Sequence, residues 1–312
     1  MTLSDLFITP VYLILFGFAA YLIRPLVTTR ETRKYFFPAL YVRFAGAIAL
    51  GLIYQFYYAG GDTFNYFTHG SRWIWEAFKS DPLMGIKLLT ESGGERVGET
   101  FEWSQHIWYY RDEKSFFVVR ITAFFDLFTL HTYSATALFY AAFSFSGLWA
   151  MYAAINTMYH QPKLLAYAIL FVPSVVFWGS GILKDTITLG ALGWLTWATI
   201  NMVEFRKWSP KYWLIALCMA WMIFSIKSYI VICYVPLVFV WVYLKQVRNI
   251  RNTFVKVSVA PILLVVFGAL GYFSLEQISS QSDKYSLDSF ARQAAVTAYD
   301  IRYGWGARTG GD

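Results

Sequence analysis

The feature that most constrains this chain is a series of continuous apolar segments, several of them close to 18 residues or longer. A helix needs about 20 apolar residues to cross the hydrocarbon core of a bilayer. Lipid offers the backbone no hydrogen-bond partners, so only helices and closed barrels can span it. These segments are apolar throughout rather than alternating. The sequence therefore predicts an all-α protein, a polytopic bundle of transmembrane helices.

The composition agrees with a membrane protein. Only 14% of the 312 residues are charged and 57% are hydrophobic, whereas a soluble domain carries about 25% charged residues. The first apolar segment, residues 6–23, has no basic region before it and no small-residue cleavage site, so we expect it to remain as a span. The net charge of +7 comes from cations in short loops between spans, which topology explains without nucleic acid as a partner.

Eight spans are expected. They are residues 6–23, 35–58, 134–159, 163–179, 186–204, 212–225, 229–244 and 257–273. The loop between the first two holds Arg24, Arg30, Arg33 and Lys34 against a single acid, Glu31. The positive-inside rule therefore predicts that this loop is cytoplasmic and that the N-terminus is external. The expected location is a bacterial inner membrane.

This order divides the chain into four regions. Residues 1–58 hold the first two spans, 59–133 form an outer loop, 134–276 hold spans three to eight, and 277–312 are an outer tail. The tail ends like an interrupted loop, so we expect the chain to be the N-terminal piece of a longer protein.

The outer loop is expected to contain helices. Ile74, Trp75 and Phe78 repeat at helical spacing, which predicts amphipathic helices lying on the membrane surface. The segment 116–130 is apolar but carries Arg120 and Asp126. The number of crossings favours a re-entrant or interfacial helix there over a full span.

Several charged residues are expected on the outer face. Asp62 follows Gly60-Gly61 at the end of the second span, Lys184 and Asp185 join the fourth and fifth, and Lys227 joins the sixth and seventh. Arg72, Arg111 and Arg120 belong to the same side. Lysine and arginine bind phosphate oxygens, and arginine does so bidentately. We therefore predict a site for a lipid-linked phosphate or pyrophosphate.

In this site Asp62 would be the catalytic base, which takes a proton from an acceptor hydroxyl while the sugar leaves its phosphate. Structural explanations compete with these roles. Asp62 could cap a helix, Lys184 and Asp185 could anchor a span, and Lys227 could snorkel.

Arg43, Arg120 and Asp126 have a different expectation, because ionisable groups at membrane depth usually face the protein interior and have partners there. Arg43 and Asp126 are the candidates for intramembrane ion pairs. The two cysteines, Cys218 and Cys233, are expected to be buried packing residues. The sequence predicts no cofactor and no metal ligands, and leaves a divalent metal at the site open.

A resemblance adds to these inferences. The first long outer loop opened by an acid, and the segment Phe171-Val-Pro-Ser-Val-Val-Phe-Trp-Gly-Ser-Gly-Ile-Leu-Lys-Asp-Thr186, resemble the GT-C class of polytopic glycosyltransferases. The same segment resembles bacterial membrane proteins encoded with exopolysaccharide and O-antigen genes, such as polymerases. The likeness covers residues 55–190 and implies that Asp62 takes the place of the base. It also implies that Lys184 and Asp185 face the lipid phosphate.

The chain departs from this class at two points. The loop acid of a GT-C enzyme is often one of a pair, whereas Thr63 follows Asp62 here. An external N-terminus is also not the usual arrangement of the class.

Three functions are compatible with these features, and all involve membrane lipid. The first is a glycosyltransferase or polymerase of polysaccharide biosynthesis that uses a lipid-linked glycan. The second is a transporter or flippase of such a glycan, with Arg43, Arg120 and Asp126 as a polar path. The third is a non-catalytic subunit that binds a protein partner through the outer loop. A transporter usually carries polar groups through the membrane and paired halves. Charges mostly on one side, without a visible repeat, favour the enzyme.

Overall fold

The computed structural model describes residues 3–96 and 98–247, together with the single helical residue Gly268. The chain divides into two units, Met1–Lys227 and Ser228–Asp312, and the first holds all the helices up to Val203. Within the described residues every regular element is a helix, which confirms the all-α prediction. The predictions for 257–273 and for the tail 277–312 lie outside the described residues.

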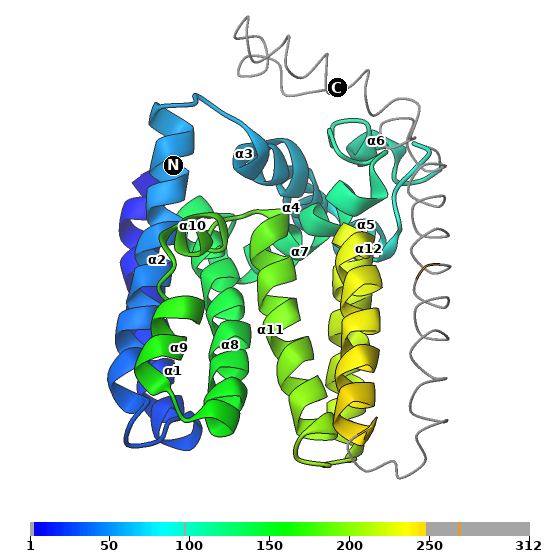
Figure 1. The fold of residues 1–312 in the computed structure, drawn as a ribbon. Coiled ribbons are helices and arrows are strands. Elements are labelled where there is room, and N and C mark those ends of the chain that lie inside the picture. The colour runs from blue at the N-terminus through cyan, green and yellow to red at the C-terminus, as the bar shows by residue number, and fades with distance from the viewer. Residues whose placement is uncertain (1–2, 97, 248–267, 269–312) are drawn as a thin grey trace, which may run out of the picture. The chain divides into compact units, whose positions relative to one another are not determined.

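The long helices are α1 (Leu3–Val27), α2 (Arg33–Phe56), α7 (Glu113–Thr129), α8 (Tyr133–Tyr159), α11 (Lys184–Val203) and α12 (Pro210–Val247) (Figure 1). The short ones are α3 (Asp62–Tyr66), the π-helix η1 (Phe67–Ser71), α4 (Arg72–Ser80), α5 (Pro82–Thr90), α6 (Phe101–Ser104), α9 (Pro162–Ile169) and α10 (Pro173–Trp178). Among the described residues α1, α2, α8 and α12 are long and apolar enough to cross a membrane.

The expected spans differ in form at two places. Residues 163–179 are not one helix but α9 and α10, because the chain leaves helical geometry at Val172, ahead of Pro173. A proline disfavours helical geometry in the residue before it and cannot continue the hydrogen-bond ladder. The turn expected at 226–228 is present as a break within α12, where Lys227 has φ −139° and ψ 76°. Eight spans are therefore not confirmed; the described residues contain four candidates.

The long helices α1, α2, α8 and α11 of the first unit run between two ends (Figure 1), and the segments at these two ends differ in charge. At one end α2 stops and α8 and α11 start, and the Thr63 hydroxyl lies 2.6 Å from the hydroxyl of Tyr133. We call this the polar end: residues 57–62, 105–113, 130–133 and 179–185, with Lys227. At the other end Trp149 Nε1 donates to the Val27 carbonyl at 3.1 Å and Tyr152 donates to Pro162. We call this the basic end: residues 24–34, 159–163 and 204–211.

The helices of residues 59–133, which the sequence predicted as an outer loop, pack on the protein itself. Ile74 and Ala77 of α4 are fully buried in the main hydrophobic cluster, together with Leu88 of α5 and Val119 of α7. The apolar side of α4 is thus covered by the chain, where the sequence predicted contact with the membrane surface. Residues 116–130 form most of α7, which is not among the four candidate spans.

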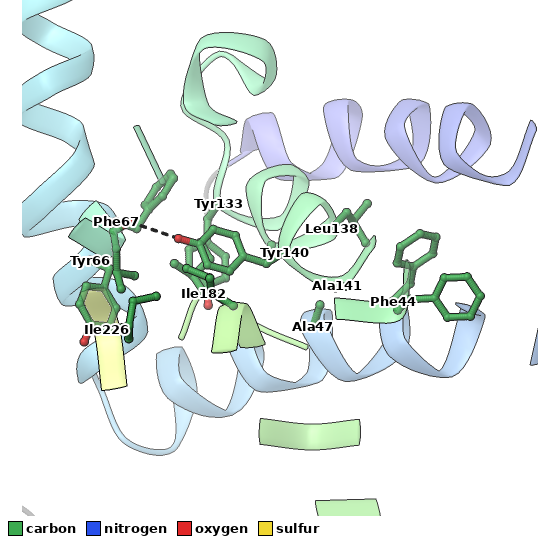
Figure 2. Packing of buried hydrophobic residues seen from close by; sticks show 14 of the residues in the cluster. Phe44, Ala47, Tyr66, Phe67, Tyr133, Leu138, Tyr140, Ala141, Ile182 and Ile226 are labelled. Atoms are coloured by element: carbon green, nitrogen blue, oxygen red, sulfur yellow. Dashed lines mark hydrogen bonds between the residues drawn. The ribbon is translucent and has the colours of Figure 1, made fainter. Parts of the chain in front are cut away.

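The centre of the unit is α8, which is buried on several sides (Figure 2). Leu138 and Ala141 lie in one cluster with Phe44 and Ala47 of α2. At the polar end the same cluster takes in six further residues: Tyr66, Phe67, Tyr133, Tyr140, Ile182 and Ile226.

Three glycines allow α8 and α11 to touch backbone to backbone. A Cβ atom added to Gly147 would lie 2.9 Å from the Gly190 Cα and even closer to its carbonyl, and one added to Gly193 would meet Gly147 itself. Small residues at such interfaces let helices approach closely. The α8–α11 contact therefore depends on the absence of side chains here.

Gly147→Ala is expected to lower the free energy of unfolding by about 1–3 kcal/mol, because the two helices must separate to admit the methyl group. Thermal unfolding in detergent measures the loss. Gly17→Ala in α1 is the matched control: its Cβ would meet only the Tyr41 hydroxyl, at 3.5 Å. Alanine there is expected to be neutral or stabilising, since it favours helix by about 1 kcal/mol over glycine. Equal effects of the two substitutions would contradict the packing argument.

Candidate functional site at the polar end

Asp62 begins the short helix α3, where the chain turns back from α2. Gly60 and Gly61 have φ values of 142° and 116°, which favour glycine. A Cβ on Gly61 would also lie 2.8 Å from the Tyr54 ring, so the turn passes close over the last part of α2. The Asp62 carboxylate is exposed and accepts a hydrogen bond from the Tyr109 hydroxyl at 3.2 Å. Two glycines and a phenol thus hold this acid at the polar end.

A second acid, Asp112, lies nearby and was not predicted as a site residue. It caps α7 by accepting hydrogen bonds from the Lys114 amide, at 3.1 Å, and from the Ser115 hydroxyl. Its Oδ2 lies 3.5 Å from Lys184 Nζ. Burial acts to raise the pKa of Asp112, but the Ser115 hydrogen bonds and the Lys184 charge outweigh it and lower that pKa. Asp112 is therefore a carboxylate at neutral pH.

Two tyrosines, Tyr66 and Tyr109, lie close enough to both acids for the charges of Asp62 and Asp112 to change their pKa. Burial raises the pKa of Tyr66, and the charges of Asp62 and Asp112 raise it further. The pKa of Tyr109 is raised to about 12, mainly by burial, with contributions from the same two acids. The charges of both carboxylates thus act on both phenols. Both phenols keep their protons at neutral pH, so each can donate a hydrogen bond. Asp62, which has no acidic neighbour in the sequence, therefore has Asp112 as an acidic neighbour in the structure.

The predicted lysines join this group through ion pairs. Lys184 contacts Asp112, and Lys227 Nζ lies 2.5 Å from Asp185 Oδ1. The lysine side chains are 25% and 22% exposed, whereas those of Asp112 and Asp185 are 51% and 56% exposed. The polar end therefore brings Asp62, Lys184, Asp185 and Lys227 together, but both lysines have internal counter-ions. Any anion bound by these lysines would have to compete with the two carboxylates.

Arg72 and Arg120 lie apart from this group. Arg72 is exposed on α4 and lies 5.8 Å from the Trp73 ring. Arg120 lies over the rings of Phe116 and Phe117 and donates to the Leu89 carbonyl at 3.5 Å. It is eight residues beyond Asp112, or about 12 Å along the helix at 1.5 Å per residue. No ion pair within the described residues joins either arginine to the group.

Arg43 is buried, but its partners are hydrogen-bond acceptors rather than an acid. Its Nη1 donates to the carbonyls of Val175 at 3.0 Å and Gly179 at 2.9 Å, and to the Ser144 hydroxyl at 3.4 Å. The guanidinium thus joins α2 to the last turn of α10 and to α8. Its positive charge suits the carbonyl end of a helix.

Asp126 is fully buried and accepts hydrogen bonds from three side chains. These are Ser71 at 2.6 Å, Thr136 at 2.7 Å and the His131 ring at 2.8 Å. His131 also stacks on Phe67, with ring centroids 4.0 Å apart. Arg43 and Asp126 therefore each have hydrogen-bond partners, but they are not paired with each other. Arg43 has carbonyl and hydroxyl acceptors, and Asp126 has the ionisable side chain of His131 among its partners.

The remaining predictions concern cysteines and metals. Cys218 and Cys233 form no disulfide, but both are exposed, so their expected burial is wrong. No cluster of metal-binding side chains occurs among the described residues. Comparison of the chain with protein-family models, curated proteins and solved structures gives no match.

Proposed function

We propose that this chain is a membrane glycosyltransferase or glycan polymerase that uses a sugar carried on polyprenyl phosphate or pyrophosphate. The observation that supports this is the network at the polar end. Asp62 accepts a hydrogen bond from Tyr109, the charges of Asp62 and Asp112 both act on Tyr109 and Tyr66, and Asp112 is paired with Lys184. A base beside phosphate-binding cations is what transfer from a lipid-linked donor requires.

In this proposal Asp62 takes the proton from the acceptor hydroxyl. Tyr109 fixes the orientation of its carboxylate through one oxygen and leaves the other for the acceptor. Lys184 and Lys227 bind the donor phosphate after exchanging Asp112 and Asp185 for it. Asp112 is the second acid, since the loop acid of GT-C enzymes is often one of a pair. Arg72 and Arg120 have no part in this step.

The proposed orientation places the polar end at the outer face of a bacterial inner membrane, with the N-terminus external. The support is the distribution of cations. The basic end carries two acids, Glu31 and Glu204, against a larger set of cations: Arg24, Arg30, Arg33, Lys34, Lys163, Arg206, Lys207 and Lys211. Cytoplasmic loops are enriched in lysine and arginine.

The flippase alternative relies on Arg43, Arg120 and Asp126 as a polar path. Each has its own partners: carbonyls for Arg43, aromatic rings for Arg120 and a histidine with two hydroxyls for Asp126. A path would have to break these contacts one after another. The third function, a subunit that binds a protein at the outer loop, would leave the Asp62 network without a role. The transferase is therefore our first proposal.

Lys184→Ala is expected to weaken binding of a short-chain polyprenyl phosphate about 10- to 100-fold, because a hydrogen bond to a charged group contributes about 1.5–3 kcal/mol. Titration calorimetry of the purified protein in detergent measures this. Lys79→Ala is the control, since Lys79 is an exposed lysine paired with Glu76 at 2.6 Å on α4. Unchanged affinity in Lys184→Ala would make this lysine an anchor of α11 and remove it from the site.

A further inference from the structure

A cavity of about 530 Å³ lies among α1, α2, α8 and α11, toward the basic end. Its volume falls within the range of about 300–1,000 Å³ that is typical of ligand pockets. Small side chains provide the room, namely Ala19 and Ala20 on α1 and Ala142, Ala150 and Ala153 on α8. Ile23 and Leu26, which also line it, are 49% and 84% exposed, so the cavity opens to the surface along α1.

Three polar side chains of the wall, Ser146, Trp149 and Trp194, form hydrogen bonds within the protein. Trp149 Nε1 donates to the Val27 carbonyl at 3.1 Å, and Trp194 Nε1 donates to the Ser146 hydroxyl at 3.0 Å. That hydroxyl in turn donates to the Phe143 carbonyl. Water in a cavity needs two or more polar partners, and apolar cavities stay dry and bind apolar groups. The cavity therefore suits a hydrocarbon chain.

A cation without a complete set of partners lies beside the opening. Arg24 falls between the lining residues Ile23 and Leu26, and its Nε is buried and has no hydrogen-bond partner among the described residues. Its guanidinium lies 4.8 Å from the Phe37 ring and donates through Nη2 to the Arg33 carbonyl at 3.2 Å. No carboxylate neutralises Arg24 among the described ion pairs. Within the part of the chain that the structure describes, the site thus provides a positive charge without an ion-pair partner next to an apolar cavity.

We propose that this cavity binds one acyl chain of an anionic phospholipid, whose phosphate lies on Arg24. A hydrocarbon chain alone would leave the charge unpaired, and a free phosphate would leave the cavity empty. Basic pockets between membrane helices on the cytoplasmic side bind anionic headgroups. This lipid is distinct from the sugar donor, because it lies at the opposite end of the helices. Its binding does not depend on the proposed transferase activity.

The site also explains how α1 is held. Most of α1 is exposed, and its buried residues are Asp5, Thr9 and Ala20. Near its end, the contact of Val27 with Trp149 fixes the backbone to α8 while the cavity separates the side chains. A bound chain would fill this gap, and the apolar surfaces of α1, α2 and α8 would be buried against it.

The test is lipid binding by the purified full chain in detergent, followed by native mass spectrometry and thermal unfolding. Dioleoylphosphatidylglycerol and dioleoylphosphatidylcholine are compared. We expect the phosphatidylglycerol to bind at least tenfold more tightly and to raise the melting temperature by about 5 °C when near saturation. Equal binding of the two lipids would overturn the assignment to an anionic phospholipid.

Two variants locate the site. Ala153→Trp fills the cavity and is expected to reduce phosphatidylglycerol binding at least tenfold, whereas Cys218→Trp, at an exposed position of α12, leaves it unchanged. Arg24→Gln is expected to make the two lipids bind alike, and Lys79→Gln at the other end of the unit is its control. If Ala153→Trp does not fold, Ala19→Trp tests the same cavity from α1. Full binding by either folded tryptophan variant would exclude the cavity as the site.

Discussion

Asp62→Asn is expected to abolish sugar transfer while leaving expression and donor binding intact. The amide keeps the shape of the carboxylate and can still accept the Tyr109 hydrogen bond, but it cannot take a proton from an acceptor hydroxyl. Loss of a positioned general base lowers turnover by about 10²- to 10⁴-fold. Transfer from a radiolabelled polyprenyl-phosphate sugar in membranes measures the effect, and calorimetry with the unlabelled lipid measures binding.

Asp81→Asn is the matched control for this experiment. Asp81 is also an exposed aspartate at the start of an outer-loop helix, where it accepts a hydrogen bond from the Leu83 amide at 2.9 Å. Its substitution is expected to leave turnover unchanged. Normal transfer by Asp62→Asn would remove Asp62 as the base. Loss of donor binding together with transfer would instead assign it to the structure of the α3 turn.

Asp126→Ala is expected to cost about 3–5 kcal/mol of unfolding free energy, because each buried hydrogen-bonding group left without its partner costs about 1–3 kcal/mol. Asp126 is fully buried, and its removal leaves Ser71, Thr136 and His131 without their common acceptor. It also leaves a cavity between η1, α7 and α8. Thermal or denaturant unfolding in detergent, followed by tryptophan fluorescence, measures the loss.

The control for Asp126 is Glu76→Ala on α4. Glu76 forms an exposed pair with Lys79 one turn away, and such pairs contribute about 0–1 kcal/mol. A small effect there and a large one at Asp126 would show that burial, not the count of charges, decides the cost. If both substitutions have equally small effects, the hydrogen bonds around Asp126 do not stabilise the fold.

Hydropathy predicts the helices of this chain well where a helix is continuous. The segments 6–23, 35–58 and 134–159 correspond to α1, α2 and α8. It fails at 163–179, where the composition is apolar but the chain breaks before Pro173. The carbonyls at the end of α10 are satisfied by Arg43, more than 130 residues earlier in the chain. A window of local sequence contains no information about such a partner.

The candidate site was likewise predicted only in part. Counting crossings placed Asp62, Lys184, Asp185 and Lys227 at one end of the helices, and the contacts of Asp62 with Tyr109, of Lys184 with Asp112 and of Lys227 with Asp185 lie at one end of the structure. The ion pairs themselves depend on side-chain positions that crossings do not give. Asp112 was missed because it stands in a segment crowded with charges, between Arg111 and Glu113. A signal was present: an aspartate three residues before Ser115, ahead of an apolar run, is typical of a helix start.

The contact of Arg43 with α10 has a consequence for how the two halves of the site stay in register. α2 leads through Gly60 and Gly61 to Asp62, and α10 leads through residues 179–183 to Lys184. The Arg43 guanidinium joins α2 to α10 through hydrogen bonds to the carbonyls of Val175 and Gly179. The spacing between Asp62 and Lys184 thus depends on the contact of Arg43 with α10 in the interior. A movement of α2 away from α10 would break the hydrogen bonds of Arg43.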